Sequence, residues 1–169
     1  MVTKDDVLET MLLECDICIH LFEKLPEGAL DYRPTPEQRS TLELLRYLSF
    51  SGVTFVNAVT GDEWASYAKG AEAAKSMTAD EFPDAMRQQK DDLREAFAAI
   101  SDEDLADGRC TLPWGAEMSI ARGLLMLPLR SMSAYRMQLF LYAKSAGNDE
   151  IWTPDCWAGV HMDKPPAAE

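Results

Sequence analysis

Two hydroxyl side chains in the last third of the chain have the spacing of a helical binding site. Ser131 and Tyr135 lie four residues apart in the segment RSMSAYRMQ. In an α-helix this spacing places two side chains one turn apart on one face, as in a helix that holds a metal ion with two histidines. Buried hydroxyls can also simply fill a core and bond to one another. The pair is therefore a site, the remnant of a site, or ordinary core.

Four long helices are predicted to position this pair. They span residues 4–24, 40–59, 78–100 and 119–145. The first is expected to be capped by Thr3, and the second opens with the capping box STLE from Ser40 to Glu43. Each helix has one apolar face, which predicts an all-α fold, a four-helix bundle with long connecting loops. Pro128 removes a backbone hydrogen bond and is expected to kink the last helix before Ser131.

A chain of 169 residues is most simply one domain. We expect residues 1–147 to form the bundle and residues 148–169 to form a C-terminal tail that packs on it, with the final PPAAE frayed. Three of the tryptophans outside the predicted helices are expected to cover one end of the bundle. These are Trp114, Trp152 and Trp157. No strand-like alternation competes with the helical pattern.

The charge balance excludes some classes of partner. Sixteen basic and twenty-nine acidic residues give a net charge of −13, which repels nucleic acid and anionic membrane surfaces. The N-terminal MVTKDDVLE has no signal-peptide pattern, and no segment is apolar for the roughly 18 residues that a membrane span needs. We therefore expect a cytoplasmic protein with reduced cysteines. Cys15 and Cys18 form a CxxC within a helix, where small buried side chains are expected rather than a redox pair.

The two histidines are too far apart to form a site together. His20 follows Asp16 by four residues, which predicts an exposed ion pair on the first helix. His161 lies in the tail and is expected to be solvated.

Three segments resemble proteins of the DinB/YfiT-like family. They are LPEGALDYRPTPEQRSTLELLRYL, TLPWGAEMSIARGLL and LRSMSAYRMQLFLYAKSAG, and the last one corresponds to the family pattern His-x-x-x-His-Arg-x-Gln. The resemblance implies a four-helix bundle of up-down-down-up topology, commonly a homodimer. It also implies a divalent metal held by three histidines, one from the second helix and two from the fourth. Some relatives are thiol-dependent transferases or isomerases.

This sequence departs from the family pattern at the implied metal ligands. The resemblance places the three histidine positions at Tyr47, Ser131 and Tyr135, while Arg136 and Gln138 of the motif remain. Neutral hydroxyls are poor ligands for zinc or nickel compared with imidazole. The sequence therefore predicts no metal, no other cofactor and no metal-dependent catalysis of the family type.

Two interpretations of this trio stay open. The rings and hydroxyls can form a packed plug in place of the metal shell, or they can line a polar pocket in which Tyr47 and Tyr135 donate to a small ligand. In the pocket, Arg136 would pair with a carboxylate of the ligand, although it can equally bond to helix backbone or an acidic loop.

Three functional hypotheses follow. The first is a homodimeric DinB-like protein with a degenerate, metal-free site that binds a small molecule or has an accessory role. The second is a metal-independent or thiol-dependent transferase or isomerase that uses Tyr47, Tyr135 and Arg136. The third is a metal enzyme with other ligands, such as Glu43 with a water molecule.

Overall fold

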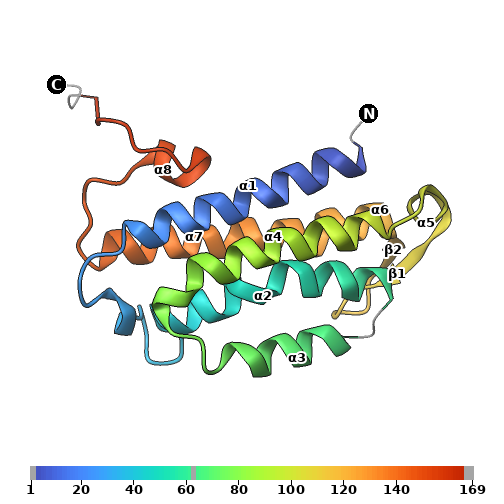
Figure 1. Cartoon of the computed structure of the whole chain (residues 1–169), viewed down its shortest axis with the longest axis horizontal. Helices are drawn as coiled ribbons and strands as arrows, with labels where there is room; N and C mark the ends of the chain where they lie inside the picture. The colour runs from blue at the N-terminus through green and yellow to red at the C-terminus, as the bar shows by residue number, and fades with distance from the viewer. Residues whose placement is uncertain (1–2, 62–63, 166–169) are drawn as a thin grey trace.

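Four long helices lie side by side in the computed structural model, which describes residues 3–61 and 64–165 (Figure 1). They are α1 (Lys4–Glu23), α2 (Thr41–Thr60), α4 (Phe82–Ala98) and α7 (Arg130–Ser145). Both α1 and α2 contact α4 and α7, so the four close a ring around a shared core. This arrangement confirms the predicted helical bundle. Its up-down-down-up order stays a prediction.

Helix starts follow the capping signals in the sequence. Thr3 and Asp6 form a reciprocal capping box at the start of α1, and Ser40 and Glu43 do the same for α2. The third long helix begins later than predicted, because a 3-10 turn, η2 (Ala79–Glu81), precedes it and Pro83 occupies its first turn. Proline is tolerated there, since that backbone position needs no hydrogen-bond donor.

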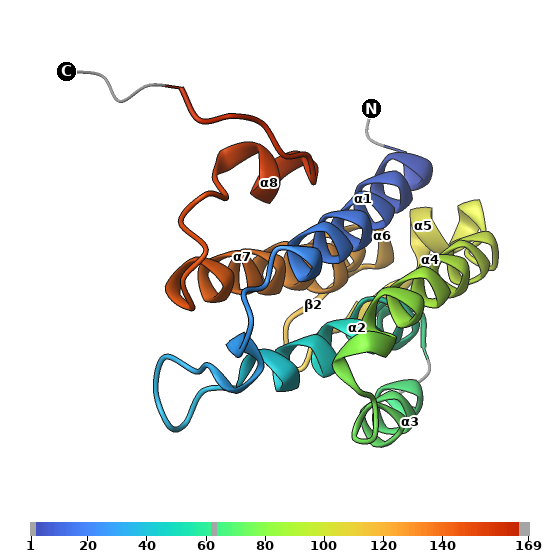
Figure 2. The same cartoon turned by 60° about the vertical axis from the view of Figure 1, so that its left-hand side comes forward.

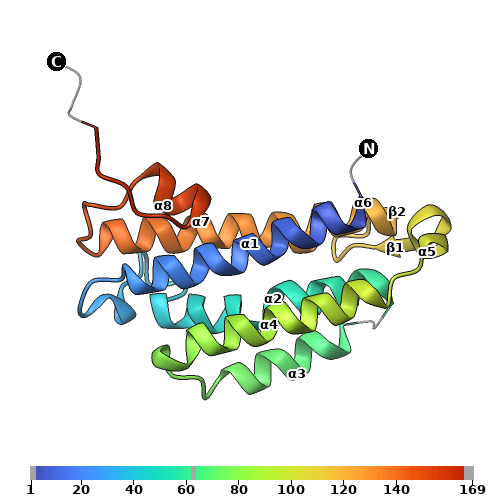
Figure 3. The same cartoon turned by 45° about the horizontal axis from the view of Figure 1, so that its top comes forward.

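Several short elements were not predicted. They are the 3-10 turn η1 (Ala29–Asp31), α3 (Ala65–Ala74), α5 (Asp102–Asp107), α8 (Thr153–Ala158) and a two-stranded antiparallel hairpin of β1 (Arg109–Thr111) and β2 (Glu117–Ser119). The expectation of no strands was thus wrong for the hairpin. Each strand has three residues with a buried one at the centre, and an alternation this short is not recognisable in a sequence. Figure 3 shows α3 beside α2, on the side of the bundle opposite α8.

The fourth helix of the bundle is continuous but irregular before Ser131. It comprises α6 (Ile120–Leu124), a π-helical turn labelled η3 (Leu125–Leu129), and then α7. Pro128 lies inside the π-helical turn, where the proline that removes a helical hydrogen bond was expected to act, and the kink itself stays a prediction.

A buried amide joins two helices of the core. The Gln89 side chain of α4 donates from Nε2 to the Leu48 carbonyl at 2.9 Å, and its Oε1 accepts from the Gly52 N–H at 2.9 Å. Leu48 and Gly52 are the i and i+4 residues that bond to each other in a regular helix. Gln89 therefore bridges these two backbone groups of α2, one residue beyond Tyr47, and its Oε1 also accepts from the Val53 N–H at 3.3 Å.

The cysteine prediction is confirmed for α1. Cys15 and Cys18 are both fully buried in the core, and burial raises the pKa of the Cys15 thiol to about 12. A thiol in this environment stays protonated and is a poor nucleophile. Both therefore act as small apolar side chains.

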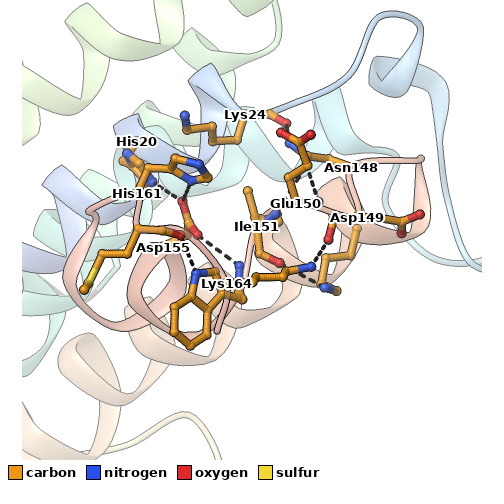
Figure 4. Close-up of polar contacts among 12 residues, drawn as sticks. His20, Lys24, Asn148, Asp149, Glu150, Ile151, Asp155, His161 and Lys164 are labelled. Carbon is orange, nitrogen blue, oxygen red and sulfur yellow. Dashed lines mark hydrogen bonds and ion pairs between the residues drawn. The ribbon is translucent and has the colours of Figure 1, made fainter. Parts of the chain in front are cut away.

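The C-terminal segment packs on the bundle through α8, which contacts α1 and α7 (Figure 2). The carboxylate of Asp155 in α8 is fully buried and meets both histidines: His20 Nε2 at 2.8 Å and His161 Nδ1 at 3.2 Å (Figure 4). The predicted pair of His20 with Asp16 was wrong, because Asp16 pairs with Lys90 of α4 at 2.5 Å. His161 is likewise not simply solvated.

The three tryptophans do not share one end of the bundle. Trp114 lies in the β1–β2 turn, whereas Trp152 and Trp157 lie at α8 near the opposite end (Figure 1). The frayed end predicted for the final PPAAE spans residues 165–169, of which 166–169 lie outside the described residues. Within the described residues, no helix is long and apolar enough to cross a membrane.

Acidification is expected to weaken the docking of α8. Burial raises the pKa of Asp155, but hydrogen bonds from Trp152, His20 and His161 outweigh it and leave that pKa below its ordinary value. A lowered folded-state pKa adds stability above the unfolded value, and this stability is lost as the pH falls through the folded value. The unfolding free energy of Asp155→Asn, compared with the parent protein by urea titration, should therefore show a deficit at pH 6 that shrinks below about pH 3.8. A deficit that is constant with pH would contradict this role.

Candidate functional site

Two of the three predicted site residues are in contact. The rings of Tyr47 on α2 and Tyr135 on α7 meet edge to face, with centroids 4.7 Å apart and an interplanar angle of 64°. Both residues are half-buried. Ser131 is half-buried one turn before Tyr135, and its hydroxyl makes no hydrogen bond with the residues that the structure describes. The contact therefore consists of two phenols from facing helices.

A cation lies over this pair. The guanidinium carbon of Arg39 is 4.2 Å from the centroid of the Tyr47 ring and 5.7 Å from that of Tyr135. Arg39 is exposed, and among the described residues its guanidinium has no hydrogen bond or close ion pair, although its charge is attracted to the Glu43 carboxylate. Cation–π attraction holds it over the rings while its donors stay available. Arg39 was not among the predicted site residues, because nothing in the spacing distinguishes it from the other charges of its loop.

Gln138 of the family motif fixes the loop that carries Arg39. Its Nε2 donates to the Tyr142 hydroxyl at 2.6 Å, and that hydroxyl donates to the Arg39 carbonyl at 3.0 Å. The backbone of Arg39 is thereby tied to α7. Gln138 thus supports the site indirectly, by fixing the backbone of Arg39 through Tyr142.

Arg136 is committed elsewhere and is not free for a ligand beside the tyrosines. Its Nε and Nη2 donate to the Glu14 carboxylate of α1 at 2.8 and 3.1 Å, and its Nη1 donates to the Cys156 sulfur at 3.2 Å. Burial opposes the charge on Arg136, but the bonds to Glu14 outweigh it and raise the pKa of the guanidinium. Arg136 was predicted to bond to a ligand, to helix backbone or to an acidic loop. The structure instead pairs it with an acidic residue on another helix, Glu14 of α1.

A cleft opens beside Tyr47, between α2 and α3. It has a volume of about 310 Å³ and is lined by Arg39, Glu43, Arg46, Tyr47, Phe50, Tyr67, Ala71, Ala74 and Lys75. Tyr135 contacts Tyr47 but is not part of the cleft lining. Since α3 was not predicted, one wall of this cleft was not predicted either.

Glu43, the alternative metal ligand, has two partners already. Its carboxylate accepts the Ser40 backbone N–H at 2.7 Å and pairs with Arg33 at 3.2 Å. The hydrogen bond from Ser40 lowers the pKa of Glu43, with a smaller contribution from Arg33. Glu43 is thus ionised and caps α2.

The phenol of Tyr47 is a hydrogen-bond donor and not a base. Burial, and then the nearby Tyr135, raise the pKa of Tyr47 above its ordinary value. The neutral phenol of Tyr47, the Tyr135 ring, a serine hydroxyl and a guanidinium over the rings are a poor environment for a divalent cation. The residues at these positions therefore do not fit the metal that the family resemblance implies.

The sequence model of the DinB superfamily matches residues 16–128, which is more than half of the chain. The chain belongs to the DinB superfamily. The matched region of this DinB protein includes Tyr47 and ends before Ser131 and Tyr135, so their correspondence rests on the motif resemblance alone. No curated protein matches the sequence.

The solved structure of a DinB-like protein from Bacillus subtilis, YjoA, has the same fold. The TM-score is 0.67 at 17% sequence identity, with 87% of this chain and 96% of the other covered. At this identity the likeness establishes the fold of the DinB protein and says nothing about its ligand.

A larger cavity at the other end of the molecule is a weaker candidate. It measures about 450 Å³ between the start of α1 and the α5–α6 region, and its walls include Val7, Leu105 and Leu124. Lys4, its one basic group among the lining residues, donates to the Ile100 carbonyl at 2.7 Å. Orientation of a ligand needs a few convergent polar groups, which the Tyr47 cleft has.

Proposed function

We propose that this DinB protein binds a small organic molecule in the cleft beside Tyr47 and does so without a bound metal. The observation that carries the proposal is the pairing, in one cleft wall, of a half-buried neutral phenol with the uncommitted guanidinium of Arg39. Cleft volume also supports it, since about 310 Å³ is at the lower end of the range for ligand pockets, roughly 300–1,000 Å³.

In this proposal, Tyr47, Ser131 and Tyr135 are a degenerate metal site in which aromatic packing has replaced coordination. The transferase or isomerase alternative is weaker, because its substrate anchor Arg136 is bound to Glu14. The neutral Tyr47 could serve such an enzyme only as a proton donor.

Filling the cleft tests the proposal without knowledge of the natural ligand. Ala71 lines the cleft from α3, and Ala73 is exposed on the same helix and does not line it. A fragment library screened by protein-observed NMR should give ligands that shift the signals of Tyr47. Ala71→Trp should abolish these shifts, and Ala73→Trp should keep them, with circular dichroism to check that both fold. If no fragment shifts Tyr47, or if Ala71→Trp binds as the parent does, the proposal is wrong.

Metal addition is expected to leave the stability of the protein unchanged. A metal that binds only the folded state at 100 times its dissociation constant would add about 2.7 kcal/mol. Zn²⁺ or Ni²⁺ added to the chelator-treated protein should give no rise in the melting temperature, and elemental analysis of untagged protein should find far less than one equivalent. A stoichiometric metal that is lost in Tyr135→Phe would overturn the metal-free proposal.

A further inference from the structure

We infer that the ligand of this cleft is a small aromatic carboxylate, held by Arg39 and Arg46 over a wall of aromatic rings. The inference rests on the proposed function and specifies the chemical class of the ligand. Three features of the cleft support this ligand class: its charge, the hydrogen bonds that its cations already make, and its apolar wall.

The cleft has the opposite charge to the protein as a whole. The chain has a net charge of −13, yet the cleft lining contains three basic residues and one acid, Glu43. The Glu43 carboxylate is already used by the Ser40 N–H and by Arg33. An anionic ligand would therefore be repelled by most of the surface and attracted at this cleft.

The hydrogen bonds within the cleft leave two guanidinium groups with free donors. Arg46 donates from Nε to the Met77 carbonyl at 2.8 Å, which fixes the side chain and leaves its terminal nitrogens without an acceptor among the described residues. Arg39 makes no such bond and lies over Tyr47. The third cation, Lys75, is exposed and pairs with Glu72. Guanidinium groups bind a carboxylate through two parallel hydrogen bonds, so Arg39 and Arg46 form the anion-binding part.

The rest of the wall favours a flat apolar body. The ring of Phe50 lies 5.8 Å from that of Tyr47 and 5.4 Å from that of Tyr67, centroid to centroid. Ala71 and Ala74 of α3 complete the lining with small side chains, which leave room for a ring. Aromatic side chains bind aromatic ligands by edge-to-face or offset contacts. The small volume restricts the ligand to about one ring with a short acidic side chain.

Three phenylpropyl probes of similar size and different charge, together with inorganic phosphate, test this assignment. We would titrate the parent protein with 3-phenylpropionate, 3-phenylpropionamide and 3-phenylpropylamine, and follow Tyr47 by NMR at low and high salt. The carboxylate should bind at least tenfold more tightly than the amide, and the amine should not bind. Arg39→Gln should weaken carboxylate binding by about tenfold or more, the scale of one charge-assisted bond. Arg87→Gln removes the same charge from an exposed arginine of α4 that pairs with Asp84, and should bind as the parent does.

The outcomes separate the ligand class from the proposed function. Equal binding of amide and carboxylate, preference for the amine, or displacement of the carboxylate by an equal concentration of phosphate would each overturn the aromatic carboxylate. So would unchanged affinity in Arg39→Gln. In all of these cases, fragments blocked by Ala71→Trp would still support a binding cleft. If neither probes nor fragments shift Tyr47, both the ligand class and the proposed function are wrong.

Discussion

Replacement of Arg136 by alanine is expected to lower the free energy of unfolding by about 3–5 kcal/mol, the range for breaking one side of a buried ion pair. The side chains of Arg136 and Glu14 are only 5% and 7% exposed, and two hydrogen bonds join them. In Arg136→Ala the Glu14 carboxylate keeps the hydroxyl of Ser133, at 2.7 Å, as its remaining donor. A buried carboxylate with one neutral donor must be protonated or gain water, and both cost stability.

Two further variants separate charge from packing. Arg94→Ala removes an exposed arginine paired with Asp91 and should cost less than about 1 kcal/mol. The double variant Glu14→Leu with Arg136→Met removes both charges and should recover most of the loss, because apolar replacements of a buried pair are often neutral or stabilising. Urea unfolding followed by circular dichroism would measure all three. An Arg136→Ala loss as small as that of Arg94→Ala would rule out a stabilising pair.

Replacement of Gln89 by leucine is expected to be the next most damaging change. The amide satisfies the Leu48 carbonyl and the Gly52 N–H, and each buried backbone group left without a partner costs about 1–3 kcal/mol. Hydrogen exchange at the Gly52 amide should also accelerate, because that N–H loses its acceptor. This second measurement distinguishes the loss of the hydrogen bonds from a general loss of packing.

Gln88→Leu is the matched control for this variant. Gln88 precedes Gln89 on α4, is exposed, and bonds only to Asp92 at 2.9 Å. Its replacement should change the unfolding free energy by no more than about 0.5 kcal/mol. If Gln89→Leu is as stable as the parent protein, the Leu48 carbonyl and the Gly52 N–H bond to each other without the amide, and the Gln89 amide is not needed for stability.

Features that depend on local sequence could be predicted, and features that depend on distant contacts could not. The caps at Thr3 and Ser40 and the burial of Cys15 follow from residues within one or two turns. The partner of His20 lies 135 residues away in α8, so the local Asp16 was the wrong choice. Although alanine favours a helix, α3 has only ten residues and no side-chain cap, so it depends on packing against α2.

The candidate site shows the same division. Helical spacing predicted Tyr135 as a site residue together with Ser131, and the family resemblance added Tyr47. The structure places the rings of Tyr47 and Tyr135 in contact. Arg136 directly follows Tyr135 in the sequence and was therefore predicted to hold the carboxylate of a ligand. Its side chain leaves α7 on another face, toward Glu14, and the cation over the phenols comes instead from a loop about a hundred residues earlier.

The bond from Tyr142 to the Arg39 carbonyl has a kinetic consequence. The backbone of the loop is tied to α7 before any ligand arrives, while the guanidinium above Tyr47 still has open donors. A ligand therefore need not order a segment of chain on arrival, which removes a slow conformational step and part of the entropic cost. Ligands of different affinity should accordingly enter this cleft at similar rates and differ in how long they stay.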